Sequence, residues 1–178
     1  GGGDTVSYSY RLDEDGTTRY GEIQTELDEF GDLTTYERDE RGNVTKIIHP
    51  DNGMEFFEYD EMNHCIYHKD QVGVVTRYDY DVSGLLLRQI VELQNGLSYS
   101  ASADQTKFAI TTYTYYELGE TDCNVSGLVK SLQTPEGTIT TYRYDKYGNQ
   151  IAITDACGNT TTYVYDKLGH VVKKTTAE

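Results

Sequence analysis

Hydrophobic and polar residues alternate along this chain in short runs, and turn signals interrupt the runs at close intervals. In residues 142–144 and 163–165 two Tyr stand two positions apart, so both rings of a pair face the same side of a strand. An Asp follows each pair directly, and a Gly stands three positions after that Asp, an order typical of a tight turn. This pattern predicts strands of about 5–6 residues that are joined in hairpins.

The motif Tyr-x-Tyr-Asp-x-x-Gly returns along most of the sequence. Complete or looser copies occupy residues 10–16, 36–42, 57–63, 78–84, 142–148 and 163–169. The turn acid advances by equal steps from Asp39 to Asp60 to Asp81 and from Asp145 to Asp166, and Asn124 fills the same slot one step before Asp145. The step is about 21 residues, and a fixed period of this length indicates an array of similar units, each of which contacts its neighbours.

A weaker turn divides each unit in half, so that the unit reads strand, turn, strand, turn. The Gly of this second turn precedes the next turn acid by the same interval in four units, but the interval from Gly53 to Asp60 is one position shorter. The interval from Asp81 to Asn124 is about two periods long, although only one unit lies between them. We expect the additional residues to form surface insertions near 94–107 and 116–123. We therefore expect residues 1–178 to form one array with two insertions. Because the chain begins with three Gly and has no initial Met, we read it as a piece of a larger protein.

The turn residues have a clear structural role. Asp at the first position of a type I turn accepts backbone N–H groups, and Gly at the fourth position adopts the left-handed conformation that returns the chain. We assign this role to Asp39, Gly42, Asp60, Asp81, Gly84, Asn124, Gly127, Asp145, Gly148, Asp166 and Gly169. Because the acid recurs at the same slot in every unit, we assign it to the turn and not to acid–base catalysis.

The aromatic residues that precede these turns form a second set. Stacked units would align the rings into an aromatic ladder across the strands. The rings are those of Tyr36, Phe57, Tyr59, Tyr78, Tyr80, Tyr113, Tyr115, Tyr142, Tyr144, Tyr163 and Tyr165. Rings beside Asp and Asn also suit contacts with a sugar, so carbohydrate binding at a cell surface is the alternative function. Buried rings favour the ladder, and exposed rings along a groove favour binding.

The charge of the chain excludes several classes of protein. Lys and Arg number 15 against 30 Asp and Glu, so the formal net charge is −15. This charge repels a phosphate backbone and an anionic lipid surface, and we expect neither nucleic-acid binding nor membrane attachment. The longest apolar run is far too short to span a bilayer. The three cysteines, Cys65, Cys123 and Cys157, form no disulfide framework.

We find no residue set for catalysis and no cofactor motif. His64, Cys65 and His68 suggest a metal site, but on a strand the two His face one side and Cys65 faces the other. The acids of residues 13–16 allow weak calcium binding, but they form no complete calcium loop. We therefore expect a protein without enzymatic activity. Unpaired strands at the two ends of such a sheet favour self-association, which the net charge opposes.

The repeated motif resembles the YD repeats of Rhs proteins, wall-associated proteins, insecticidal Tc toxins and teneurins, and the resemblance covers roughly residues 8–174. It implies an all-β array of stacked antiparallel hairpins that forms a spiralling, open segment of a β shell. It also implies a secreted or surface-associated bacterial protein whose shell encloses a C-terminal polypeptide, commonly a toxin. The Asp-Pro-x-Gly motif that releases the enclosed polypeptide in Rhs shells does not occur here, so self-cleavage is not assigned.

Overall fold

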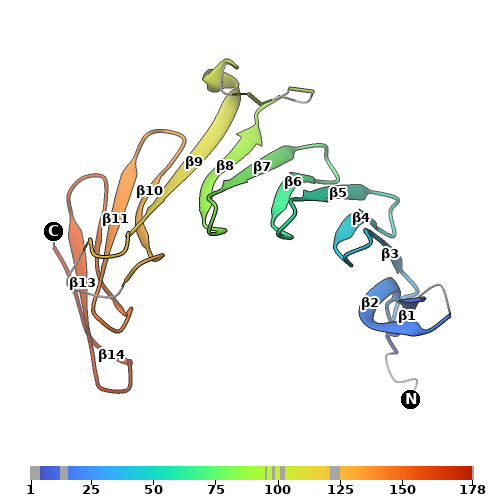
Figure 1. Ribbon diagram of the computed structural model, residues 1–178, viewed down its shortest axis with the longest axis horizontal. Helices are drawn as coiled ribbons and strands as arrows, with labels where there is room; N and C mark the ends of the chain where they lie inside the picture. Colours follow the sequence, from blue (N-terminus) through green and yellow to red (C-terminus); the bar gives the residue numbers. More distant parts are fainter. Residues whose placement is uncertain are drawn as a thin grey trace. The chain divides into compact units, whose positions relative to one another are not determined.

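The computed structural model describes residues 5–12, 16–94, 96–97, 99–100, 103–120 and 125–177. In these residues fourteen β-strands form an antiparallel sheet whose strand order follows the sequence (Figure 1). The strands are β1 (Ser7–Leu12), β2 (Thr18–Leu27), β3 (Leu33–Arg38), β4 (Val44–Ile48), β5 (Met54–Tyr59), β6 (Cys65–Lys69), β7 (Val75–Tyr80), β8 (Leu86–Glu92), β9 (Phe108–Tyr115), β10 (Val129–Gln133), β11 (Ile139–Tyr144), β12 (Gln150–Thr154), β13 (Thr160–Tyr165) and β14 (Val171–Thr176). The expected all-β array of antiparallel hairpins is confirmed.

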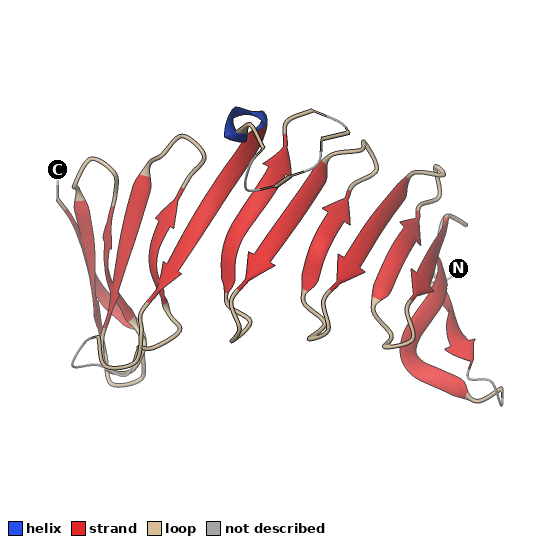
Figure 2. Cartoon of the chain, turned by 45° about the horizontal axis from the view of Figure 1, so that its top comes forward, coloured by secondary structure: helices blue, strands red, loops and turns tan. Residues whose placement is uncertain are grey.

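Helical structure is almost absent from the described residues, where a 3-10 helix at Gln105–Lys107 is the single helical element (Figure 2). It follows that no helix in the part of the chain that the structure describes could cross a membrane. The chain divides into two compact units, each of which is described here by itself. Unit 1 contains residues 1–77 and 91–107, and unit 2 contains residues 78–90 and 108–178.

Both units are built from the same hairpin. A first turn joins strand pairs such as β3 and β4, and a second turn then joins β4 to β5. Five of the first hairpins contain a β-bulge at the same place. In β3–β4, Glu37 pairs with Lys46 and Arg38 pairs with Val44, so Thr45 is the extra residue. The pairs β5–β6, β9–β10, β11–β12 and β13–β14 repeat this register shift.

The sheet has a small core. The buried apolar side chains among the described residues are those of Val75, Ile90, Phe108, Val125 and Ala152. Most strand residues are half-buried, because each lies in a single layer of hairpins and contacts its neighbours along the sheet. Stability therefore depends on local contacts that recur from hairpin to hairpin.

One turn starts at a different residue from the one that the sequence indicated. The backbone N–H of Asn52 donates to the carbonyl of His49 at 2.9 Å, and Asn52 has a φ of 65°. The left-handed residue is therefore Asn52 and not Gly53. Counted from Asn52, the interval to Asp60 equals the interval in the other units.

The loop between β8 and β9 is longer than the other second turns. The backbone N–H of Leu93 donates to the carbonyl of Lys107 at 3.0 Å and closes a loop that includes the 3-10 helix. The sequence predicts the second insertion near 116–123, and there the connection from β9 to β10 is closed by a bond from the N–H of Gly127 to the carbonyl of Tyr116. Residues 121–124 lie outside the described residues. The expected turn residue Asn124 is among these.

Candidate functional site: the repeated turns and the tyrosine contacts

The turn at Asp39 shows how the motif closes each first hairpin. The backbone N–H of Gly42 donates to the carbonyl of Asp39 at 3.2 Å, and Gly42 has a φ of 91°. One carboxylate oxygen of Asp39 accepts the backbone N–H groups of Arg41 and Asn43, both at 2.9 Å. Seven other Asp carboxylates likewise accept the backbone N–H groups of the second and fourth residues after them. They are those of Asp28, Asp60, Asp70, Asp81, Asp145, Asp155 and Asp166.

The residue after the left-handed position completes several turns, and our reading of the sequence missed it. The side-chain amide of Asn43 donates to the second carboxylate oxygen of Asp39 at 3.0 Å, and Asn149 and Asn159 make the same bond at 2.9 and 3.0 Å. In other units a ring nitrogen of His64 or His170 takes this place. The recurrence of Asn or His directly after Gly or Asn in five turns is the signal that could have revealed it.

These hydrogen bonds shift the acidity of the turn carboxyls. The side-chain amide of Asn149, together with backbone N–H groups, holds the pKa of Asp145 below its usual value. The pKa of Asp155 is lowered in the same way by Asn159, and that of Asp166 is lowered first by the backbone N–H of His170. Hydrogen bonds to a carboxylate favour its ionised form. The lowered pKa values therefore result from turn structure and give no sign of acid–base chemistry.

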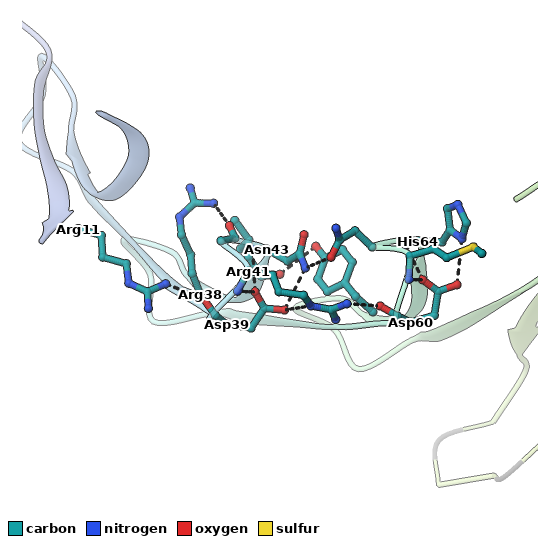
Figure 3. A network of polar contacts seen from close by, with 12 residues as sticks. Arg11, Arg38, Asp39, Arg41, Asn43, Asp60 and His64 are labelled. Carbon is teal, nitrogen blue, oxygen red and sulfur yellow. Dashed lines mark hydrogen bonds and ion pairs between the residues drawn. The ribbon is translucent and has the colours of Figure 1, made fainter. Parts of the chain in front are cut away.

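Polar contacts also link one first turn to the next in unit 1 (Figure 3). The guanidinium of Arg11 donates to the carbonyl of Asp39 at 2.6 Å, and that of Arg41 donates to the carbonyl of Asp60 at 2.8 Å. The amide of Asn43 donates to the side-chain oxygen of Asn63 at 2.9 Å. Each turn carbonyl has a second lone pair for such a donor, so the turns are joined without breaking their own bonds.

The second Tyr of the motif forms a further recurring contact. The hydroxyl of Tyr59 donates to the carbonyl of Val44 at 2.9 Å, that of Tyr115 to Leu86 at 2.7 Å and that of Tyr165 to Gln150 at 2.7 Å. Each accepting carbonyl belongs to the second residue after the Gly of a first turn. This residue begins the second strand of the first hairpin, which is the strand that contains the bulge in most of these hairpins. The register of the ladder is disturbed there, and the hydroxyl supplies a donor to the backbone.

The aromatic residues that we singled out are half-buried, which is neither of the two arrangements expected for them. Their hydroxyl contacts with backbone favour a structural role. A groove of about 880 Å³ in unit 2 nevertheless lies along the first turns and is lined by Asp145, Tyr147, Tyr163 and Asp166, among others. Both carboxylate oxygens of Asp145 and of Asp166 already accept hydrogen bonds from their own turns.

The histidines of unit 1 pair with acids. His64 contacts Asp60 at 2.9 Å, while the Nε2 atoms of His49 and His68 contact the two oxygens of Glu55 at 2.8 and 2.7 Å. The Cys65 thiol donates to the carbonyl of Tyr67, so the structure does not bring His64, Cys65 and His68 together. Within the described ranges no group of three such side chains could hold a metal ion. The acids of residues 13–15 lie outside those ranges.

Comparisons with known proteins fit this repeating architecture. The model of the RHS Repeat family matches residues 124–156 and 146–178. Residues 124–178 therefore carry Rhs repeats. No curated protein sequence matches the chain.

Solved structures extend the likeness beyond the residues that the family model matches. The chain aligns over 98% of its length with a chain in the crystal structure of TcdB2–TccC3, at a TM-score of 0.66 and 16% identity. With a chain in a crystal structure of TcdB2–TccC3–Cdc42, 97% of this chain aligns at a TM-score of 0.65 and 16% identity. With a chain in a mutant Tc holotoxin pore of Photorhabdus luminescens, 96% aligns at a TM-score of 0.64 and 16% identity. The chain spans 9% of the length of each of these chains. At this identity the likeness shows a shared fold.

Proposed function

We propose that this chain is a structural, non-enzymatic part of a secreted or cell-surface bacterial protein. In this proposal it forms part of the wall of a β shell that surrounds another polypeptide. The observation that carries the proposal is the repeated hairpin, in which turns, bulges and Tyr hydroxyls join each unit to the next. Such a unit can be added without redesigning a core. The shared fold with TcdB2–TccC3 supports it, because there too hairpins of this kind belong to a much longer chain.

The natural full-length protein provides the test. Limited proteolysis should leave the enclosed polypeptide intact while the wall is closed. Replacing both Gly148 and Gly169 by Val opens two turns of the wall, because Val resists the φ of 85° and 84° found there, and cleavage of the enclosed polypeptide should then increase. The matched control replaces the same two residues by Asn, which tolerates this conformation. Equal cleavage in all three proteins would contradict the proposal.

Carbohydrate binding is the second candidate, and the groove beside Tyr147 and Tyr163 is the observation that favours it. A glycan array with the 178-residue chain tests it directly. Under the shell proposal we expect no glycan to bind. Binding that is abolished by Tyr147→Ala and Tyr163→Ala, with Tyr8→Ala as the control, would favour the sugar-binding function instead.

A further inference from the structure

Exposed apolar side chains gather on one face of unit 1, on the side of the sheet opposite Tyr36 and Phe57. Leu27 pairs with Leu33 across β2 and β3, and Met54 and Phe56 alternate on β5. The register places all four on the same face, because Thr35, two positions after Leu33, pairs with Ile48, which in turn pairs with Met54. Their exposed fractions are 39%, 48%, 40% and 37%. We call Leu27, Leu33, Met54 and Phe56 the apolar stripe.

The second turns border this stripe and are acidic. Residues 28–32, 49–53 and 70–74 contain five Asp and Glu and no Lys or Arg. Two of these turns also place an apolar residue at an exposed tip, Phe30 and Val72. Residues such as Asp28 and Asp70 use their carboxylates within the turn, but they remain negatively charged there. The stripe therefore has an acidic rim with apolar tips.

The negative charge of the chain is concentrated in the same unit. Unit 1 holds 8 Lys and Arg against 20 Asp and Glu, a net charge of −12, whereas unit 2 holds 7 against 10, a net charge of −3. A second copy of this chain would bring a like-charged surface to the stripe, and an anionic membrane would also be repelled. A basic partner is attracted both by the rim and by the field of the whole unit.

We propose that the apolar stripe docks a basic, amphipathic polypeptide segment. Its apolar side chains cover Leu33, Met54 and Phe56, and its Lys and Arg lie against the acidic second turns. Lys46 and Lys69 are the cross-strand partners of Phe56 on β4 and β6, and Lys46 pairs with Glu37 at 2.9 Å and lies over the Phe56 ring at 6.0 Å. The basic side chains of the segment therefore lie over the second turns and not beside these two lysines. This inference goes beyond the shell function, because it concerns what one face binds and does not require enclosure.

A labelled amphipathic peptide of leucine and lysine is a suitable probe, and fluorescence anisotropy with the 178-residue chain measures its binding. We expect Met54→Gln with Phe56→Gln to weaken binding by about tenfold or more, since two apolar contacts are lost. Val164→Thr is the matched control, because Val164 is an exposed apolar strand residue in unit 2 and its replacement should leave binding unchanged. Leu33→Gln is a second stripe variant in case the double variant fails to fold.

The charge requirement is tested separately. Glu29→Gln with Asp32→Asn should weaken binding and reduce its dependence on salt, and a peptide of leucine and glutamate should not bind. Equal binding of the two peptides, or binding unaffected by the stripe variants, would overturn the proposal. Sedimentation of the chain without peptide measures whether the stripe is covered by a second copy. A dimer that the stripe variants dissociate would show that a second copy covers the stripe, and this too would overturn it.

Discussion

A residue with positive φ stands at the fourth position of the first and second turns, and it is the residue on which each turn depends. It is Gly in most turns and Asn at Asn52 and Asn63, with φ of 65° and 67°. A Cβ added at Gly148 would meet the Cδ1 atom of Leu128 at 3.8 Å, an ordinary contact. Backbone conformation, and not lack of space, therefore selects Gly at this position.

Replacing Gly148 or Gly169 by Val should lower the free energy of unfolding by at least about 1 kcal/mol, because a β-branched residue resists the left-handed conformation. Chemical denaturation of the 178-residue chain measures the change. Gly148→Asn is the control and should be much milder, since Asn occupies the same slot at residue 63. If both Val variants unfold like the parent, the turns do not require a left-handed residue.

The turn carboxyls predict a loss of stability in acid. The pKa of Asp145 is lowered in the folded chain, so its contribution is complete above the usual unfolded value of about 3.9 and is lost as pH falls through the folded pKa. Asn149→Ala removes the amide donor and should raise the pKa of Asp145 towards its usual value. NMR titration of the carboxyl carbon measures this shift, with Asp155 as an internal control that should not change. An unchanged pKa for Asp145 would rule out the amide as a cause.

At the scale of the element, the strands and first turns could be predicted from the sequence because alternation and Asp-x-x-Gly are local signals. The second turn at His49 could not, since Asp51-Asn52-Gly53 contains two residues suited to positive φ and only the hydrogen-bond pairing selects Asn52. The bulges leave no local signal either. A bulge adds one residue to the strand after the turn, and it becomes visible only when the partner strand is known.

The Tyr hydroxyl contacts give a prediction for single hairpins. Tyr59→Phe removes the donor to the carbonyl of Val44, and Tyr165→Phe removes the donor to that of Gln150. Each change should lower the free energy of unfolding by about 1 kcal/mol. Tyr147→Phe is the control, because this ring is 77% exposed at a turn tip, and it should unfold like the parent. Thermal denaturation followed by circular dichroism distinguishes the variants. Losses as small as in the control would show that the hydroxyls do not stabilise the bulged strands.

Glu55 connects three segments, because its two oxygens contact His49 before β5 and His68 on β6. The side chain of His68 is the largest cause of the lowered pKa of Glu55. The stabilisation from Glu55 is therefore present above its unfolded pKa and is lost as pH falls through the folded value. Glu55→Gln should lower stability at pH 7 and reduce the difference in stability between pH 7 and acid. Urea denaturation at several pH values tests this, and parallel curves for both proteins would contradict it.

At the scale of the molecule, the sheet ends in strands with one neighbour, β1 and β14, and β14 is exposed along its whole length. Unpaired backbone groups at such edges favour association with other chains. The charge of −15 opposes it, and salt screens that charge beyond about 8 Å at physiological ionic strength.

We therefore predict a largely monomeric chain in dilute, low-salt solution that associates as salt or concentration rises. Sedimentation velocity at two salt concentrations measures this. Val172→Glu, which adds a further negative charge to the exposed strand β14, should reduce the association. Association that weakens with added salt would point to a charge-paired interface in place of edge pairing.

The turn at Tyr116 has a consequence for protein engineering. The N–H of Tyr116 donates to the carbonyl of Leu128 at 3.0 Å, and the N–H of Gly127 donates to the carbonyl of Tyr116 at 2.9 Å. These two bonds close the hairpin as Asp39 and Gly42 close theirs, but a much longer stretch of chain lies between their ends than in the turn at Asp39. Both bonds join backbone atoms, so they can form although the loop between their ends is long. The hairpin of β9 and β10 is thus the place in unit 2 where we expect a foreign peptide to be tolerated for display, because the two bonds that close it lie outside the loop.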